Sequence, residues 1–177
     1  MSNTLADLKS TFWNMSKAIL ADIITEEPDR WIRKMYPRNG APDWTVDDNI
    51  VFLNLTPRDD DYAKQRDSEY IGQDNTIMRH AMRTRVWDLE VNAYGPRSYD
   101  MVTAMKDGVF SQSIKMFLAK KDIYLVPLMQ TERQANEIFA GQWWERWDIT
   151  LTFNERYVAV DDVGRIEEVS IRAEALR

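Results

Sequence analysis

The chain has 177 residues, of which 23 are basic and 29 acidic, so its formal net charge is −6. The absence of cysteine excludes a disulfide framework, a zinc finger, an iron–sulfur cluster and a thiol nucleophile. The single histidine, His80, excludes a multi-histidine metal cluster and leaves one residue for any histidine-based acid or base. We therefore predict a protein without enzymatic activity, with no catalytic residues, no cofactor and no metal.

The composition predicts a folded protein with one domain that spans residues 1–177. Apolar residues make up 44% of the chain and seven residues are tryptophan, so the chain can bury enough surface to fold. Glycine and proline are scarce, so no long flexible linker divides the chain. The start lacks the pattern of a signal peptide, and the longest apolar run, residues 123–129, is far shorter than the roughly 20 residues that span a bilayer. We expect a soluble protein made in a cytoplasm, with no membrane partner.

The first expected element is a helix that Pro28 ends. Thr4 and Asp7 have the spacing of a helix N-terminal cap, with a carboxylate in the first turn, where the helix dipole favours it. This pattern favours a helix that packs on a core over one that binds a partner or a membrane surface. Apolar residues recur at steps of three and four, the period of one helical face: Leu5, Leu8, Phe12, Met15, Ile19 and Ile23.

Residues 29–49 are expected to be irregular, and residues 50–56 to form a short strand that Pro57 closes. A long polar loop is then expected over about residues 57–76. The loop contains three adjacent carboxylates, which favour a solvated contact loop over a metal site because no histidine or spaced acidic partner completes a coordination shell. These carboxylates are Asp59, Asp60 and Asp61.

Two segments about sixty residues apart carry the same pattern. In residues 85–93 and again in residues 146–154, large apolar side chains alternate with polar ones, beginning at Trp87 and Trp147. Strict alternation over this length predicts strands of an antiparallel sheet that are buried on one face. Asp88, Glu90 and Asn92 are expected on the opposite, polar face. The tryptophans are expected in a core between the sheet and the helices.

A second helix is expected between these strands, beginning near Ser98 and ending near Lys120 and Lys121. Gly108 lies in its interior, where glycine weakens a helix by about 1 kcal/mol relative to alanine, so close packing against a neighbour is expected there.

After that helix, residues 123–129 are expected to form a buried strand, and residues 131–139 a short helix. The strand that begins near residue 146 is expected to reach Val160, turn over residues 161–164 and return through residues 166–173 as a hairpin. Together these elements predict the α+β class, an antiparallel sheet with helices packed on one face.

The order of these elements resembles that of phage neck and tail-terminator proteins, most closely in residues 83–96, which end in Tyr94-Gly95-Pro96, and in residues 141–153. The resemblance implies a structural virion protein of the tail or neck, assembled in the host cytoplasm. Such proteins form rings, here expected to be hexamers, that cap the tail tube or the sheath end and join it to the head-completion or adaptor protein. No catalytic residue carries over from the family.

In a ring, the excess of acidic over basic residues would affect how DNA passes through the channel. Acidic loops that line a channel would repel DNA phosphates, so DNA would pass through without specific binding. The loop at Asp59, Asp60 and Asp61 is a candidate for that lining or for a contact with the next subunit. The basic residues Arg79, Arg83 and Arg85 fall on one side of a strand extension over residues 77–85. They would pair with the acidic loop of the adjacent subunit, face the DNA, or form a solvated strand face.

Three alternatives remain open at this stage. The first is a head–tail adaptor or another tail-completion protein. The second is a nucleic-acid-binding module, for which the acidic composition is unfavourable because such modules use a basic groove. The third is a metal-dependent hydrolase that would use Asp59, Asp60 or Asp88.

Overall fold

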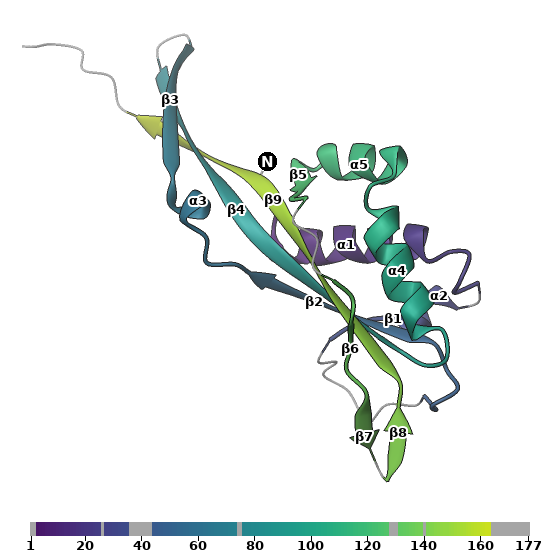
Figure 1. Cartoon of the computed structure of the whole chain (residues 1–177). Coiled ribbons are helices and arrows are strands. Elements are labelled where there is room, and N and C mark those ends of the chain that lie inside the picture. The colour runs from purple at the N-terminus through teal and green to yellow at the C-terminus, as the bar shows by residue number, and fades with distance from the viewer. Residues whose placement is uncertain are drawn as a thin grey trace, which may run out of the picture.

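The computed structural model describes residues 3–25, 27–35, 44–73, 76–127, 131–139 and 141–163 (Figure 1). A large, mostly antiparallel sheet runs through the molecule, and the helices pack against one part of it, which confirms the α+β prediction. The helices within these ranges are α1 (Leu5–Ile19), α2 (Pro28–Trp31), α3 (Asp61–Lys64), α4 (Ser98–Gly108) and α5 (Gln112–Ala119).

The sheet has the strand order β1–β2–β4–β9–β5, with β3 paired to β4 and β6 paired to β9, while β7 and β8 form a separate hairpin. Only β1 joins its neighbour, β2, in parallel. The strands are β1 (Ile32–Lys34), β2 (Ile50–Pro57), β3 (Arg66–Gln73), β4 (Thr76–Tyr94), β5 (Ile123–Leu125), β6 (Arg133–Gln134), β7 (Glu137–Phe139), β8 (Gln142–Trp144) and β9 (Arg146–Val163).

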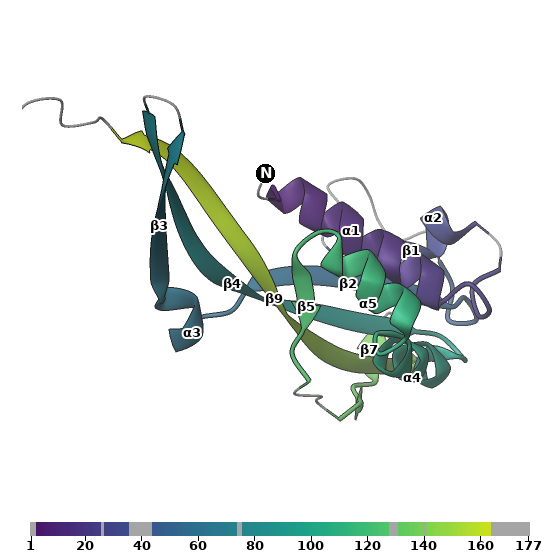
Figure 2. The same ribbon diagram turned by 90° about the horizontal axis from the view of Figure 1, so that it is seen from above.

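The two longest strands, β4 and β9, form the axis of the molecule. They pair without interruption from Ile77 opposite Val163 to Tyr94 opposite Arg146. The predicted strands at 85–93 and 146–154 are the inner halves of this pair, so both predictions are confirmed. Both strands continue well beyond the helices, as Figure 2 shows.

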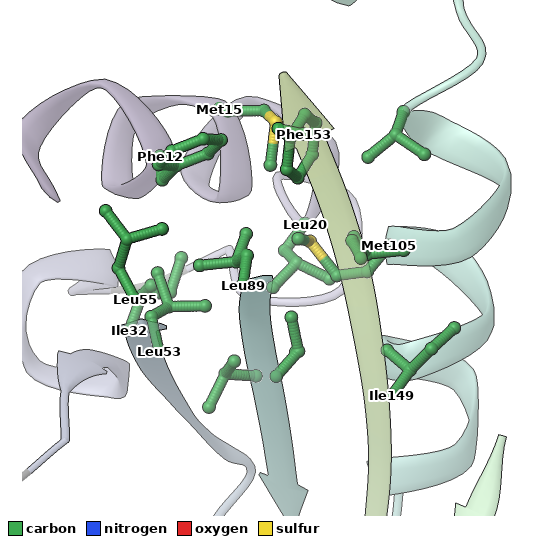
Figure 3. Close-up of a cluster of buried hydrophobic side chains, with 14 of the residues drawn as sticks. Phe12, Met15, Leu20, Ile32, Leu53, Leu55, Leu89, Met105, Ile149 and Phe153 are labelled. Atoms are coloured by element: carbon green, nitrogen blue, oxygen red, sulfur yellow. The ribbon is translucent and has the colours of Figure 1, made fainter. Parts of the chain in front are cut away.

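The hydrophobic core lies between the helices and one face of this inner half. Trp87, Leu89, Val91 and Ala93 of β4 are all buried on that face, as the alternation predicts. Figure 3 shows side chains of α1 and α4 meeting those of β2, β4 and β9. The ring of Phe12 lies 4.8 Å from that of Phe153, and both side chains are almost fully buried.

The opposite face of the inner half is mostly polar, as expected, but two of its polar side chains are buried. Asn92 and Thr152 are about as inaccessible as the core residues, with 5% and 4% of their surface exposed. Hydrogen bonds account for this: the amide oxygen of Asn92 accepts from Arg146, and the hydroxyl of Thr152 donates to Asp88. Polar groups can be buried at small cost where such partners satisfy them.

Helix α1 has the predicted cap but not the predicted length. The Thr4 hydroxyl accepts from the Asp7 amide. The Asp7 carboxylate accepts from the Thr4 hydroxyl and from the Thr4 amide, and these two hydrogen bonds lower the pKa of Asp7. The helix ends at Ile19, and Pro28 is the first residue of α2. The prediction of a helix up to Pro28 was wrong because residues 20–24 continue the apolar pattern in a turn, in which Ile24 still reaches the core.

The second predicted helix is two helices, α4 and α5, with a break after Gly108. Ser98 is the first helical residue and is buried, and Arg97, not Ser98, occupies the cap position. A Cβ built on Gly108 would lie 2.5 Å from Cγ2 of Ile19 in α1, which confirms the predicted close packing. The chain breaks here because α4 and α5 pack against α1 and β5 in different directions (Figure 1).

The prediction of a long polar loop over residues 57–76 was wrong. Residue 57 ends β2, and the segment then forms the single turn of α3 and the whole of β3. Strand β3 pairs residue for residue with the outer half of β4, from Arg66 opposite Arg83 to Gln73 opposite Thr76. Backbone pairing to an existing strand stabilises a polar sequence that has no strand periodicity of its own.

Two further predictions near the C-terminal end of the chain need correction. Residues 131–139 contain β6 and β7 rather than a helix, because they pair with β9 and β8. Residues 161–163 continue β9 and do not form a turn. The returning strand expected at 166–173 lies outside the described residues.

Candidate functional site

The candidate residues of the sequence analysis gather on a three-stranded extension of the sheet. We call it the arm; it consists of β3, residues 76–84 of β4 and residues 156–163 of β9. Figures 1 and 2 show it projecting from the helix-covered part of the molecule, which we call the body. The acidic turn lies where β2 leads through α3 into the arm.

A buried charge network joins the arm to the body. The carboxylate of Glu155, with no exposed surface, accepts from Arg85 Nη2 at 2.6 Å and from Arg85 Nε at 2.8 Å. Trp87 Nε1 donates to the same carboxylate at 2.8 Å, and Asn3 Nδ2 at 3.0 Å. Every oxygen lone pair of Glu155 therefore faces a donor, the condition under which a buried carboxylate is tolerated.

The other two candidate arginines lie further along the same face of β4. Arg79 Nη2 is 2.6 Å from the Asp161 carboxylate, and this hydrogen bond raises the pKa of Arg79. The Arg83 guanidinium lies over the ring of Tyr157, 5.0 Å from its centroid, and Arg85 lies 4.6 Å from the same ring. Arg83 Nε is buried without a hydrogen-bond partner among the described residues.

The partners of these arginines were missed by the sequence analysis. Glu155, Tyr157 and Asp161 stand directly opposite Arg85, Arg83 and Arg79 in the pairing of β4 with β9. If the pairing of β4 with β9 shifted by two residues, the alternation of apolar and polar residues would stay the same but other side chains would face the arginines. Only the observed register therefore assigns these partners. The signal that could have found them is the match of Trp87 to Phe153, which sets the register in the body.

The three adjacent carboxylates do not converge on one point. The Asp60 side chain accepts from the Tyr62 amide and caps α3, while Asp59 and Asp61 lie 3.3 and 2.9 Å from Lys64 Nζ. The hydrogen bond with Asp61, followed by that with Asp59, raises the pKa of Lys64. Asp59 and Asp61 stay almost fully exposed, so the turn presents negative charge to solvent.

Asp88, the third carboxylate of the hydrolase alternative, is joined to Asp60 by an arginine. Arg58 lies 3.6 Å from Asp88 and 4.0 Å from Asp60, and Asp88 also accepts from Thr152 at 2.7 Å. A guanidinium thus occupies the space between the two carboxylates. Within the described ranges, no three His, Cys, Asp or Glu side chains are placed to hold a metal ion together.

A second ionic cluster, on the polar face of the body, surrounds Arg146. Arg146 pairs with Glu137 and with Asp148, and its guanidinium lies 5.5 Å from the ring of Tyr94. Burial opposes the charge of Arg146, but the hydrogen bond with Asp148 and the neighbouring carboxylates raise its pKa. Burial raises the pKa of Tyr94 to about 12. This cluster ties the β7–β8 hairpin to the sheet.

The body also carries an apolar groove that no sequence pattern indicated. It has a volume of about 400 Å³ and lies between α5 and β5. Phe110, Met116 and Tyr124, which line it, are each 41–55% exposed. We call it the α5–β5 groove.

Comparisons with known proteins identify one relationship. The family model described as phage neck terminator protein matches residues 10–175. No curated protein sequence matches the chain. Among the helices that the structure describes, none combines the length and the apolar character needed to cross a membrane.

Proposed function

The chain belongs to the phage neck terminator protein family, and from this premise we propose that it assembles into a hexameric ring that caps the tail tube or the sheath end. The family comprises structural virion proteins of the tail and neck, which contact other tail and head proteins. In the proposal, the ring joins the tail to the head-completion or adaptor protein. Assembly takes place in the host cytoplasm.

The observation that carries the ring proposal is the arm. Among the described helices, only the single turn of α3 contacts this three-stranded sheet, at its base, so the sheet lacks a core of its own. Such small sheets gain stability when another surface packs on them. Apolar side chains remain accessible on the arm, among them Tyr70, Ile71 and Val160, with 61%, 40% and 52% of their surface exposed. A neighbouring copy that covers the arm, head to tail, generates a closed ring when the rotation closes.

Among the three candidate arginines, we assign the subunit contact to Arg83. Arg79 and Arg85 are paired with Asp161 and Glu155 of their own chain. Arg83 has no ion pair in the described part of the chain, and its Nε, like that of Arg79, is buried without a hydrogen-bond partner there. A carboxylate of the next subunit would pair with the Arg83 guanidinium; the exposed Asp59 and Asp61 are the candidates.

The channel proposal follows from charge. A hexamer repeats the net charge of −6 around the ring, and the acidic turn at Asp59, Asp60 and Asp61 is the proposed lining wherever it does not pair with Arg83 of the next subunit. Negative walls repel phosphates, so DNA would slide through without specific binding.

We also propose that residues 1–177 form one domain. The core draws side chains from Leu8 in α1 to Phe153 in β9, so segments from both ends of the sequence share one cluster. The absence of enzymatic activity stays a prediction.

Electron microscopy of the concentrated purified protein, with and without isolated tail tubes, tests the ring. We expect a six-fold ring that sits on the tube end. A compact monomer under both conditions would contradict the proposal, and a filament would point to a tube protein instead. Labelling in the particle separates the terminator from a head–tail adaptor, which would lie on the head side of the ring.

Light scattering of Arg83→Glu tests the interface assignment. We expect weaker assembly, whereas Arg30→Glu, a control on the body, leaves the oligomer unchanged. An unchanged oligomer for Arg83→Glu would remove Arg83 from the interface. A gel shift at low salt tests the channel, and a retained DNA complex would favour a nucleic-acid-binding module.

A further inference from the structure

The two faces of the arm differ in chemistry. Residues that stand opposite each other in an antiparallel pair lie on the same face, and so do residues two apart along one strand. One face therefore carries Arg79, Arg83, Tyr157 and Asp161, whose charges and rings contact one another. On the other face, no ion pair joins the described strands, and Arg156 contacts the sulfur of Met82 instead.

This second face, which we call the acidic arm face, combines apolar and acidic side chains, and Arg156 lies at its base, where it donates to Met82 Sδ. Its apolar residues form rows across the three strands, and Ile71 and Val160 are 40% and 52% exposed. Carboxylates stand beside each row: Asp162 with Ile71, Glu69 with Val160, and Asp67 further down β3. The remaining apolar members are Met78, Met82 and Val158, and His80 lies between Glu69 and Val160.

The α5–β5 groove on the body has the complementary composition. Its walls are apolar and include Phe110, Met116 and Tyr124, all of which are more than 40% exposed. Exposed apolar surface gathered in one hollow is typical of a contact site for another molecule.

The charge beside this groove is positive, although the chain as a whole is acidic. Lys115 lines the groove, with its Nζ 5.5 Å from the Phe110 ring, and Lys120 and Lys121 follow directly after α5. Residues 112–121 contain these three lysines, and Asp122 follows them directly. The lysine stems also offer apolar surface to a partner while their ammonium groups reach the rim.

We propose that the acidic arm face of one copy docks into the α5–β5 groove of the next copy. The apolar rows fill the groove, and Asp67, Glu69 and Asp162 meet the lysines at its rim. The arm points away from its own α5 in both views, so its own groove is out of reach (Figures 1 and 2). Two acidic arm faces would repel each other, which disfavours a symmetric dimer.

This contact is head to tail, because it joins two different surfaces of the same molecule. Such contacts propagate around a ring, so the inference rests on the proposed ring and names the surfaces that build it.

Disulfide trapping tests the contact directly, because the chain has no cysteine of its own. A mixture of Ile71→Cys and Met116→Cys proteins is oxidised and analysed on a non-reducing gel. We expect a cross-linked dimer, with about tenfold less product when Tyr70→Cys replaces Ile71→Cys. Tyr70 is the adjacent exposed residue on the opposite face of β3, so it is a matched control. Equal yields from both mixtures would overturn the proposal.

Charge reversal provides the second test. Glu69→Lys and Lys115→Glu each change an exposed side chain, so circular dichroism should remain that of the parent protein. Each single variant should raise the concentration needed for assembly by about tenfold, because it places like charges at every contact between identical copies. An equimolar mixture of the two should restore assembly, because subunits that alternate around a ring of six pair opposite charges at every contact. The double variant Glu69→Lys/Lys115→Glu places the opposite charges on both surfaces of every copy and should restore assembly to within about threefold of the parent.

The docking contact and the terminator ring can fail independently in these experiments. If the parent protein forms rings and both single variants assemble like it, the docking surfaces are wrong and the ring proposal stands. If the trapped pair forms but the parent never yields a closed ring on tail tubes, the contact is supported and the terminator ring fails.

Discussion

Strands β4 and β9 run through two regions of the molecule that have opposite environments. In the body, their inner halves are covered by α1 and α4, and Leu89 and Phe153 have at most 1% of their surface exposed. In the arm, the described helices leave the same two strands uncovered apart from the turn of α3 beside β4, and apolar residues such as Val160 remain half exposed. The pairing of the strands is continuous across both regions.

The body and the arm are stabilised by different interactions. The body is stabilised by buried apolar area, while the arm is held mainly by strand pairing and by the charge network at its root around Glu155. Side chains on the arm are therefore free of core packing and available for contacts with another subunit. Substitutions at matched positions in the two regions should reveal this difference.

The largest effect is expected in the body core. Phe153→Ala removes a fully buried ring that packs against Phe12, so we expect a loss of about 3–5 kcal/mol in the free energy of unfolding. Val160→Ala, seven residues further along the same strand, should change it by less than about 0.5 kcal/mol. Urea denaturation of the unassembled protein measures both, and similar losses would contradict the distinction between body and arm.

The junction of the two regions should be the next most sensitive. Glu155→Gln removes the buried charge that faces Arg85 and should lower the free energy of unfolding by about 3 kcal/mol. Asp161→Asn, at the exposed pair with Arg79, should leave the midpoint of denaturation unchanged within error. Hydrogen exchange of the arm amides would show whether the arm loosens first in Glu155→Gln, and arm protection equal to that of the parent would contradict the role of this network.

A smaller contrast is expected between two glycines. Gly108→Ala places a Cβ 2.5 Å from Cγ2 of Ile19, so we expect a loss of about 1–3 kcal/mol from overpacking between α4 and α1. Gly72→Ala in the arm meets no atom within 4 Å and should be neutral or slightly stabilising. Thermal unfolding of both variants measures the contrast, and a Gly108→Ala variant as stable as the parent would mean that α1 can shift without cost.

The sequence predicted the body better than the arm for a physical reason. Alternation at Trp87 and Trp147 reflects burial on one face, and burial imposes a period on the residues. In the arm, both faces remain accessible, so residues 66–73 show no such period and were expected to be a loop. The cap at Thr4 and Asp7 was also predictable, because it depends on residues three apart.

The candidate arginines could be identified from the sequence, but the side chains that pair with them could not. Arg79, Arg83 and Arg85 were placed on one strand face, yet the carboxylates that pair with Arg79 and Arg85 lie about seventy to eighty residues away on β9. The α5–β5 groove lies just beyond the break after Gly108, a glycine that packs closely against Ile19 in α1, and neither the groove nor the identity of this neighbour is visible in the sequence.

The net charge of −6, the lack of cysteine, the single histidine and the alternating body strands are properties of the sequence alone. They determined a folded α+β protein with a helix-covered sheet, because composition and periodicity report burial directly. Only the tertiary structure decided that the polar segment at 66–73 is a strand, that the sheet extends into an arm, and that Glu155 meets Arg85 at its root. Those features depend on the register between distant strands, and register is set by the simultaneous packing of all the elements against one core.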